Sequence, residues 1–334
     1  MNVLVTGATG FLGSHLAKTL AQRGYNVRAL VRNTGKLSRL QGHDIETFEG
    51  NLLDIDSLKK STDGQDIVFH NAGMVDQWGK RETFYNVNVD GTKNLLEACL
   101  SSGIKRFVHT SSLTVLGKPR GKSPMDETSP YTERYFEFYT ETKILSEKAV
   151  LDYYNKGKLP VTVIRPGIIW GPGDTTILPR LERLTRKGLI FNIGKGNNVL
   201  CLTYISNLVE GLILAAESPE AIGQIYHITD DEKITSRTFF TELTKIMGLH
   251  LPAISIPFSV LYATAYLFET LAKSMRLSKP PIITRYGICL LGCDYNYDIS
   301  RAKRELGYNP KTSFKEGMEN TARWYKNERL INKV

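Results

Sequence analysis

The feature that most constrains the fold of this 334-residue chain is a glycine-rich turn near its N-terminus. An apolar run at residues 2–5 leads directly into Gly7, Gly10 and Gly13, and a helical pattern of apolar residues follows. Glycines at this spacing let a backbone approach a pyrophosphate closely, and the helix that follows aims its N-terminus at the phosphates. The turn therefore predicts a dinucleotide site, and the alternative is a tight turn of only local importance.

Strand and helix patterns alternate after this turn. Further strands are expected at 27–31, 45–48, 67–70, 106–110 and 161–164, and further helices at 55–61, 87–101 and 138–156. Such alternation is typical of right-handed crossovers between parallel strands. The sequence therefore predicts an α/β fold in which a doubly wound parallel sheet carries helices on both faces.

The pattern changes after Pro166, where the run Gly171-Pro172-Gly173 indicates a loop. We expect residues 1–170 to form a dinucleotide-binding Rossmann domain, to which 201–229 return. That return would consist of a strand at 202–205, a helix at 208–217 and a strand at 224–228. Residues 171–200 and 230–334 are expected to form a smaller, mainly helical substrate lobe.

Composition narrows the classes of partner. The net charge of +9 could favour a polyanion, but the charge is spread over both halves of the chain without a basic arm. We therefore expect no nucleic-acid partner. The four cysteines lack the neighbours of a disulfide scaffold or a metal site, so free thiols and no metal are expected. The first residues lack a signal-peptide pattern, which predicts a cytoplasmic protein.

The end of the second predicted strand indicates the cofactor. Arg32 and Asn33 stand there, with Lys36 and Arg39 beyond, and no carboxylate appears before Asp44. An acidic residue at this position would bind a ribose 2′-hydroxyl and favour NAD, whereas an arginine offers a planar fork to a 2′-phosphate. NADP is therefore the preferred cofactor, and NAD bound less selectively is the alternative.

A candidate acid–base pair lies on the predicted helix at 138–156. Tyr139 and Lys143 are four residues apart, which places them on one helix face. A phenol titrates near pH 10, and a neighbouring ammonium lowers that pKa. Upstream, Ser111 and Ser112 follow the fifth predicted strand at the sheet edge where ligands bind, and a hydroxyl there can hold a substrate oxygen.

Taken together, these motifs resemble the extended short-chain dehydrogenases/reductases along essentially the whole chain. The matching segments are Thr6-Gly7-Ala8-Thr9-Gly10-Phe11-Leu12-Gly13, His70-Asn71-Ala72-Gly73, Asn88-Val89-Asp90-Gly91-Thr92, residues 110–117, Tyr139 with Lys143, Arg165-Pro166-Gly167, Gly171-Pro172-Gly173-Asp174 and residues 298–310.

The resemblance implies roles for individual residues. Tyr139 would be the general acid/base, Lys143 would lower its pKa and bind the nicotinamide ribose, and Ser112 would hydrogen-bond the reacting oxygen, with Ser111 as the near alternative. Asn88 is expected to position a helix more than to act directly. The implied cofactor contacts are Gly7, Thr9, Gly10, Phe11, Leu12, Gly13, Arg32, Asn51, Leu52, Ala72, Gly73, Asn88, Thr110, Tyr139, Lys143, Pro166 and Ile168. Asn51 stands where the family often has an aspartate near the adenine.

Differences between this chain and the motifs of other branches indicate which branch of the family the chain resembles. This chain has Ser111-Ser112-Leu113 at the position where dehydratases of the family carry Thr-Asp-Glu, so dehydration is not expected. Sugar-nucleotide epimerases commonly carry Ser-Pro-Tyr where this chain has Phe138-Tyr139. Arg180, Arg183 and Arg186 recur every three residues, which we interpret as a solvated helix face rather than a diphosphate site. An epimerase with tightly bound NAD stays the alternative function.

The C-terminal region is similar to the 3β-hydroxysteroid dehydrogenase and dihydroflavonol reductase-like branch. Residues 251–268 carry no charge, and Pro252 and Pro257 interrupt the start, so 258–268 is the clean helical part. Its amphipathic spacing favours a helix that covers an apolar substrate pocket or the core. A membrane contact through 251–272, or a span, is the alternative. The resemblance implies an NADP-dependent oxidoreductase that interconverts a ketone and a secondary alcohol on a steroid-, flavonoid- or 3-oxoalkanoate-like substrate.

Two further hypotheses concern assembly and class. Helices expected at 90–101 and 140–154 would form a four-helix face between two copies, as family members often do, so a homodimer is predicted. Sedimentation at micromolar concentration tests it, and a clean monomer would reject it. A cofactor-sensing protein without catalysis is the remaining alternative, which the intact Ser112, Tyr139 and Lys143 set disfavours.

Overall fold

The computed structural model describes residues 1–32, 37–119, 123–135, 137–251 and 254–331, and its main feature is a seven-stranded sheet. The strand order is β11-β6-β5-β4-β1-β2-β3, and every neighbouring pair is parallel. The strands are β1 (Asn2–Thr6), β2 (Asn26–Val31), β3 (Ile45–Glu49), β4 (Ile67–His70), β5 (Arg106–Thr110), β6 (Val161–Pro166) and β11 (Ile225–Ile228). The predicted doubly wound α/β fold is confirmed.

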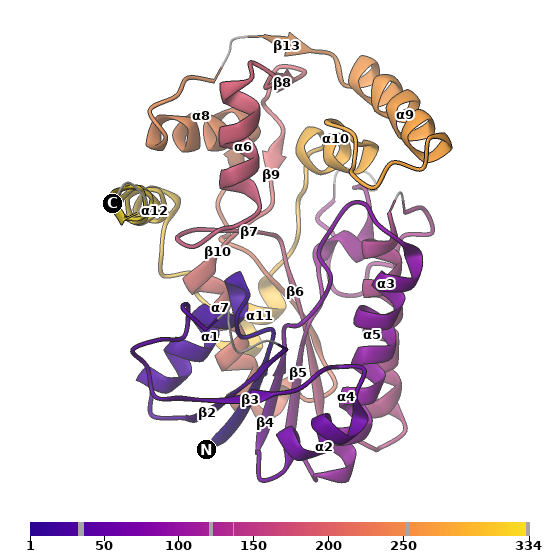
Figure 1. Cartoon of the computed structure of the whole chain (residues 1–334), viewed down its shortest axis with the longest axis vertical. Coiled ribbons are helices and arrows are strands. Elements are labelled where there is room, and N and C mark those ends of the chain that lie inside the picture. Colours follow the sequence, from indigo (N-terminus) through magenta and orange to yellow (C-terminus); the bar gives the residue numbers. More distant parts are fainter. Residues whose placement is uncertain (33–36, 120–122, 136, 252–253, 332–334) are drawn as a thin grey trace.

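Helices cover both faces of this sheet (Figure 1). One face carries α1 (Phe11–Gln22), α7 (Ile205–Glu217) and α11 (Ser300–Leu306), and the other carries α2 (Ile55–Thr62), α4 (Gly91–Ser101) and α5 (Phe138–Asn155). Since both faces are covered, β4, β5 and β6 are buried along their whole length. The helix expected at 87–101 begins with a π-helical turn, η2 (Asn86–Asp90), which follows a helix that the sequence did not indicate, α3 (Arg81–Tyr85).

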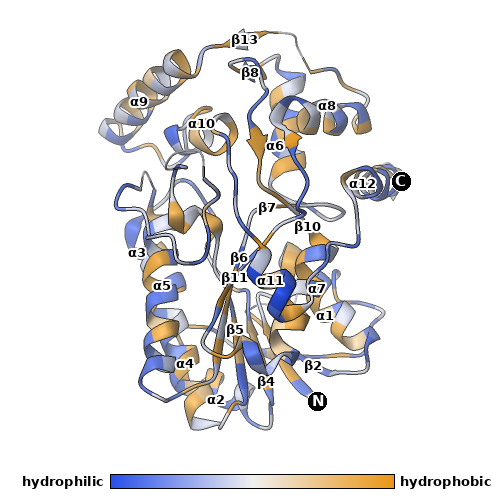
Figure 2. Cartoon of the chain, turned by 180° about the vertical axis from the view of Figure 1, so that it is seen from behind, coloured by the Kyte–Doolittle hydropathy of each residue, from blue (hydrophilic) through white to orange (hydrophobic). Residues whose placement is uncertain are grey.

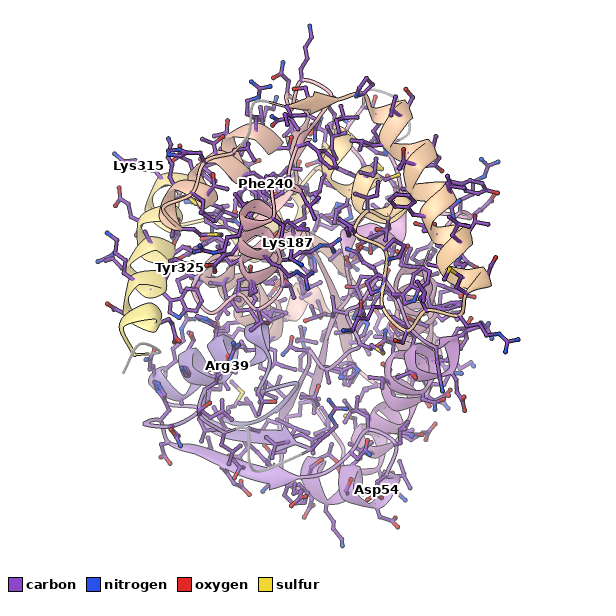
Figure 3. The ribbon with its side chains drawn as sticks, turned by 45° about the horizontal axis from the view of Figure 1, so that its top comes forward. Arg39, Asp54, Lys187, Phe240, Lys315 and Tyr325 are labelled. Atoms are coloured by element: carbon purple, nitrogen blue, oxygen red, sulfur yellow. The ribbon has the colours of Figure 1, made fainter. Side chains whose placement is uncertain are left out.

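The remaining elements lie beyond the carboxyl ends of the strands (Figure 1). The helices are α6 (Ile177–Arg186), α8 (Ser236–Ile246), α9 (Phe258–Ser274), α10 (Arg285–Gly292) and α12 (Phe314–Ile331). Short strand pairs join them: β8 (Asn192–Ile193) with β13 (Ser255–Ile256), and β9 (Val199–Leu200) with β12 (Ile234–Thr235). The 3₁₀ helix η3 (Leu113–Leu116) follows β5, whereas the second, η4 (Pro219–Ala221), lies at the amino ends of the strands, between α7 and β11. Figure 3 labels Phe240 in this upper part and Arg39 in the sheet part below it.

The segments expected to return to the sheet behave differently from one another. Residues 225–228 join it as β11, and α7 packs on its face. In contrast, β10 (Leu202–Tyr204) pairs with β7 (Ile168–Trp170) in a separate two-stranded sheet. The chain turns out of β6 at Gly167, where a Cβ atom would lie 2.5 Å from the Cys201 carbonyl oxygen, so only glycine permits this close crossing.

A buried ion pair fixes α5 to the sheet. Arg165 of β6 donates from Nη2 and Nε to the Glu147 carboxylate of α5, and the two side chains are 2% and 0% exposed. Ser111 and Tyr131 donate to the same carboxylate. Breaking a buried pair leaves one charge without compensation, so the interaction specifies how α5 sits on β6.

We predict that Glu147→Gln destabilises the fold because it leaves the Arg165 guanidinium buried without a counter-charge. The free energy of unfolding in a urea titration should fall by about 3–5 kcal/mol. Asp152→Asn removes an exposed ion pair with Lys156 on the same helix and should cost less than about 1 kcal/mol. Equal effects of the two substitutions would show that the buried pair has no special role.

Candidate active site

The glycine turn brings three backbone segments into contact. Gly7 has φ +68°, and a Cβ atom there would lie 2.9 Å from the backbone of Ala72. A Cβ atom at Gly13 would lie 2.2 Å from the Gly7 carbonyl oxygen. Any side chain would therefore push α1 away from the turn. Gly10 is the N-cap of α1 and supplies no side-chain cap, which leaves the first N–H groups of the helix available to an anion.

A buried histidine holds the segment after β4 over this turn. The two ring nitrogens of His70 form hydrogen bonds with the hydroxyls of Thr6 and Thr92, each at 2.9 Å. The Thr6 hydroxyl also accepts the backbone N–H of Ala72 at 3.1 Å. Burial, with a smaller effect of the Lys143 charge, lowers the pKa of His70 to about 3, so the imidazole is neutral at physiological pH.

The amide of Asn88 is engaged in hydrogen bonds within the protein. Its side chain is buried, accepts the backbone N–H of Met74 at 2.7 Å and donates to the hydroxyl of Thr142 at 3.0 Å. It therefore joins the segment after β4 to α5 but does not line the central cavity. Both ends of its amide are used within the protein, which favours the expected positioning role, and its contact with a cofactor stays a prediction.

The predicted catalytic side chains meet at the carboxyl end of β5. Ser112, Tyr139 and Lys143 are all buried. Lys143 Nζ donates to the Thr110 carbonyl oxygen at 2.5 Å, and Ser112 makes a hydrogen bond with Tyr139. Thr110 in turn donates from its hydroxyl to Asn71 Oδ1 at 2.6 Å. The structure therefore brings a phenol, an ammonium and a hydroxyl to one point of the sheet edge.

The pKa of Tyr139 differs from the expectation that the Lys143 ammonium lowers it. Burial raises the pKa of Tyr139 to about 12, and the hydrogen bond with Ser112 opposes that rise. Burial lowers the pKa of Lys143 to about 8, and the Glu147 carboxylate opposes that fall. In the protein without ligands, the effect of burial on the pKa of Tyr139 is thus larger than any lowering by Lys143. The ammonium of Lys143 is bound to the Thr110 carbonyl oxygen.

Ser111 and Ser112 have different surroundings although they are adjacent. The Ser111 hydroxyl donates to the Glu147 carboxylate and so belongs to the buried ion-pair cluster. The Ser112 hydroxyl accepts from Thr114 and bonds Tyr139, beside the cavity. This geometry favours Ser112 as the hydroxyl that can meet a substrate oxygen.

A cavity of about 1200 Å³ extends from the glycine turn to the helices beyond the sheet. Its lining includes Ser112 and the remaining predicted cofactor contacts, Gly7, Thr9, Gly10, Phe11, Leu12, Gly13, Arg32, Asn51, Leu52, Ala72, Gly73, Thr110, Tyr139, Lys143, Pro166 and Ile168. The far wall consists mainly of apolar and aromatic side chains, which include Ile177, Leu181, Phe239, Ile283, Tyr286 and Ile288. One end of the cavity is therefore built from backbone and polar groups and the other from apolar groups.

The outer end near β2 carries the residues expected to select the cofactor. Arg32 is exposed and lines the cavity. Asn51 uses its Oδ1 to accept the backbone N–H of Leu53 at 3.1 Å. Arg39 donates to the Gly173 carbonyl oxygen at 3.1 Å instead, which fastens the loop before α6. Asn33 and Lys36 lie outside the described residues.

These residues fit a nicotinamide dinucleotide. The turn presents uncapped N–H groups where only glycine fits, and Asn71 Nδ2 is buried in the cavity wall without a partner among the described residues. A ligand with phosphate and amide groups would satisfy both features. Gly73 also requires a small residue, because a Cβ atom there would lie 3.3 Å from Asn88 Oδ1 and 3.8 Å from Lys143 Nζ.

Several wall residues were not indicated by the sequence. Asn71, Gln77 and Tyr286 lie in loops or in a short helix, where no spacing marks a cavity. The interpretation of Arg180 as part of a solvated helix face was wrong, because Arg180 lines the cavity whereas Arg183 and Arg186 are exposed. Asp174 accepts the backbone N–H groups of residues 176–178 and so orients α6 toward the cavity.

Known proteins share this architecture and sequence. Over 329 residues the chain is 30% identical to a 2-alkyl-3-oxoalkanoate reductase of Shewanella oneidensis, with 95% of this chain and 84% of that protein covered. Over 325 residues it is 34% identical to a decarboxylating sterol-4-alpha-carboxylate 3-dehydrogenase of Mus musculus, with 95% and 89% covered.

A solved structure supports the fold. The UDP-glucuronic acid 4-epimerase of Bacillus cereus, in complex with UDP-glucuronic acid and NAD, matches with a TM-score of 0.77 at 24% identity, covering 98% of this chain and 100% of that one. Residues 4–258 also match the 3-beta hydroxysteroid dehydrogenase/isomerase family. The chain therefore belongs to that family, within the extended short-chain dehydrogenases/reductases, and is an NAD(P)-dependent oxidoreductase.

Proposed function

We propose that the protein interconverts a ketone and a secondary alcohol on an apolar small molecule, with NADP as the preferred cofactor. The observation that carries this proposal is the placement of Ser112, Tyr139 and Lys143 between a phosphate-binding turn and an apolar wall in one cavity. Residues 1–170 with 201–229 would hold the cofactor, and 171–200 with 230–334 would hold the substrate. The apolar substrates named for the relatives agree with the character of that wall.

The mechanism follows from the protein groups. A bound nicotinamide supplies the hydride chemistry. Tyr139 is a neutral phenol at pH 7, since its pKa is raised to about 12, so it can give its proton to a ketone oxygen in the reduction. Ser112 holds the same oxygen, and Lys143 adds a positive charge that stabilises the phenolate left behind. In the oxidation, the phenolate receives the proton of the alcohol.

The apolar wall disfavours the epimerase alternative. A sugar nucleotide would place hydroxyl groups and a diphosphate against the far end of the cavity, where Leu181, Phe239 and Ile288 contribute apolar surface. Polar groups that lose water without a new partner cost free energy. A ketone on a bulky apolar molecule would bury its surface there instead.

Assembly and location remain proposals. The helices α4 and α5 lie side by side on one face of the sheet (Figure 1), and this adjacency supports a homodimer in which both helices meet their copies. Sedimentation at micromolar protein concentration decides between dimer and monomer. No helix among the described residues is long and apolar enough to cross a membrane. A cytoplasmic location stays a prediction.

We predict that Tyr139→Phe lowers kcat by about 10²–10⁴-fold, because the substrate oxygen loses its proton donor. The assay follows NADPH absorbance with a panel of steroid ketones, β-keto acids, flavonoid ketones and UDP-sugars. Tyr135→Phe is the matched control, since Tyr135 lines the same cavity but is exposed. Full activity of Tyr139→Phe would exclude the acid–base role.

A separate prediction concerns the cofactor preference. Arg32→Ala should weaken NADPH binding by about 10–100-fold and leave NADH binding nearly unchanged, because only NADPH carries the 2′-phosphate that a guanidinium can bind. Fluorescence titration with both cofactors measures the two constants. Lys60→Ala, which alters an exposed cation on α2, should change neither. Tighter binding of NADH than of NADPH by the unmodified protein would contradict the proposal.

The alternative of a membrane contact is supported by α9, in which Figure 2 shows hydrophobic residues interspersed with polar ones. Val260, Leu267 and Leu271 are 52%, 54% and 51% exposed there, and Lys273 and Arg276 follow. An apolar helix face flanked by cations binds anionic lipid surfaces. Residues 252–253, within the segment predicted to make this contact, lie outside the described residues.

The protein should therefore sediment with phosphatidylglycerol vesicles. The double substitution Leu267→Asp with Leu271→Asp should reduce that binding at least about tenfold, since it removes two apolar groups and adds two negative charges. Lys60→Asp, which makes the same change in net charge at an exposed position of α2, is the control. Absence of vesicle binding by the unmodified protein would refute the contact.

A further inference from the structure

We propose that Arg180 binds a carboxylate group of the substrate, so that the preferred substrates are apolar hydroxy acids and keto acids rather than neutral alcohols and ketones. This inference rests on the proposed function and refines its substrate class. The interactions of Arg180 within the protein do not account for its place in the cavity wall.

The guanidinium of Arg180 has few partners. It donates from Nη2 to the Ile282 carbonyl oxygen at 3.2 Å, its single hydrogen bond within the described part of the chain. A guanidinium has five N–H donors, so most of them remain available. No ion pair joins Arg180 to a carboxylate among the described residues, whereas Arg186 on the same helix pairs with Glu182.

The surroundings of Arg180 make an unpaired charge costly. It lines the cavity beside Ile177 and Leu181 of its own helix and Ile282 of the facing loop. Burial lowers the pKa of Arg180, the charge of Arg183 acts in the same direction, and Asp76 opposes both. An arginine nevertheless stays charged in proteins. A partly buried cation without an ion-pair partner among the described residues can take an anionic ligand, and a carboxylate matches the guanidinium fork with two hydrogen bonds.

The other charged groups of the cavity have different assignments. Lys143 donates to Thr110, and Lys118 lies 4.8 Å from the centroid of the Tyr262 ring. Arg134 is exposed, and Arg32 is at the cofactor end. The acidic groups in the wall are Asp76 and Glu137.

Asp76 is the acidic group that acts on Arg180, but its carboxylate is bound within its own loop. It accepts the backbone N–H groups of Gln77 at 2.7 Å and Trp78 at 3.3 Å. The adjacent Gln77 Oε1 accepts the hydroxyl of Thr284 at 2.9 Å, which ties this loop to the segment that carries Ile282. Arg180 therefore lies where three segments of the cavity wall meet.

This part of the wall belongs to the same cavity as the catalytic group. Gly73, whose Cβ position would be 3.8 Å from Lys143 Nζ, is three residues before Asp76, and both Tyr139 and Arg180 line the cavity. A carboxylate at Arg180 and a hydroxyl at Tyr139 can thus belong to one molecule that occupies this cavity.

The test compares one acid with its own neutral ester. The probes are 3-hydroxydodecanoate and its methyl ester, and their oxidation with NADP⁺ is followed by NADPH absorbance. Calorimetric titration of the NADP⁺-loaded protein measures binding of the acid independently of turnover. Arg180→Gln should raise KM and Kd for the acid about 10–100-fold and leave the ester and NADP⁺ unchanged. Arg180→Lys should restore part of the acid affinity, and Arg186→Gln, at an exposed position of α6, should have no effect.

The outcomes separate this inference from the proposed function. The carboxylate site would be overturned if Arg180→Gln left turnover of the acid and the ester unchanged, reduced both equally, or weakened NADP⁺ binding. It would also be overturned if the unmodified protein did not bind the acid. If the acid binds through Arg180 but neither probe nor any ketone of the panel is turned over, the site stands and the proposed function fails.

Discussion

The buried ion pair between Glu147 and Arg165 is the interaction on which the site geometry depends. Tyr139, Lys143 and Glu147 follow one another at four-residue spacing on α5, so fixing Glu147 to β6 also fixes the rotation and height of the other two. Ser111 joins the same carboxylate, which places Ser112 beside Tyr139. A buried pair contributes little net stability, but an alternative packing of α5 would leave a charge uncompensated.

A second constraint acts on the opposite side of the cavity. The glycine turn, the His70 hydrogen bonds and the Asn88 amide hold the segments after β1 and β4 in one arrangement against α5. Together with the ion pair they surround the phenol and the ammonium with protein, which raises the pKa of Tyr139 and lowers that of Lys143. The site is thus built to keep the proton on the phenol until a substrate oxygen arrives.

The sequence predicted those features that depend on local pattern. The alternation of strands and helices, the turn at Gly7 to Gly13 and the pair Tyr139 and Lys143 all follow from spacing within one or two elements. Features set by contacts between distant segments were not predictable. The placement of Arg180 depends on a loop at residue 282, the role of Asn88 on residue 74, and the pairing of β10 with β7 on the bend at Gly167.

The central claim is that hydride moves between the cofactor and a carbon of an apolar substrate with net turnover of the cofactor. The most direct measurement uses NADPH deuterated at the transferable position of nicotinamide C4 and an apolar ketone, with the product analysed by mass spectrometry. The account predicts one deuterium on the carbinol carbon and one NADP⁺ formed per alcohol. Substrate conversion with the cofactor unchanged and no deuterium in the product would contradict it.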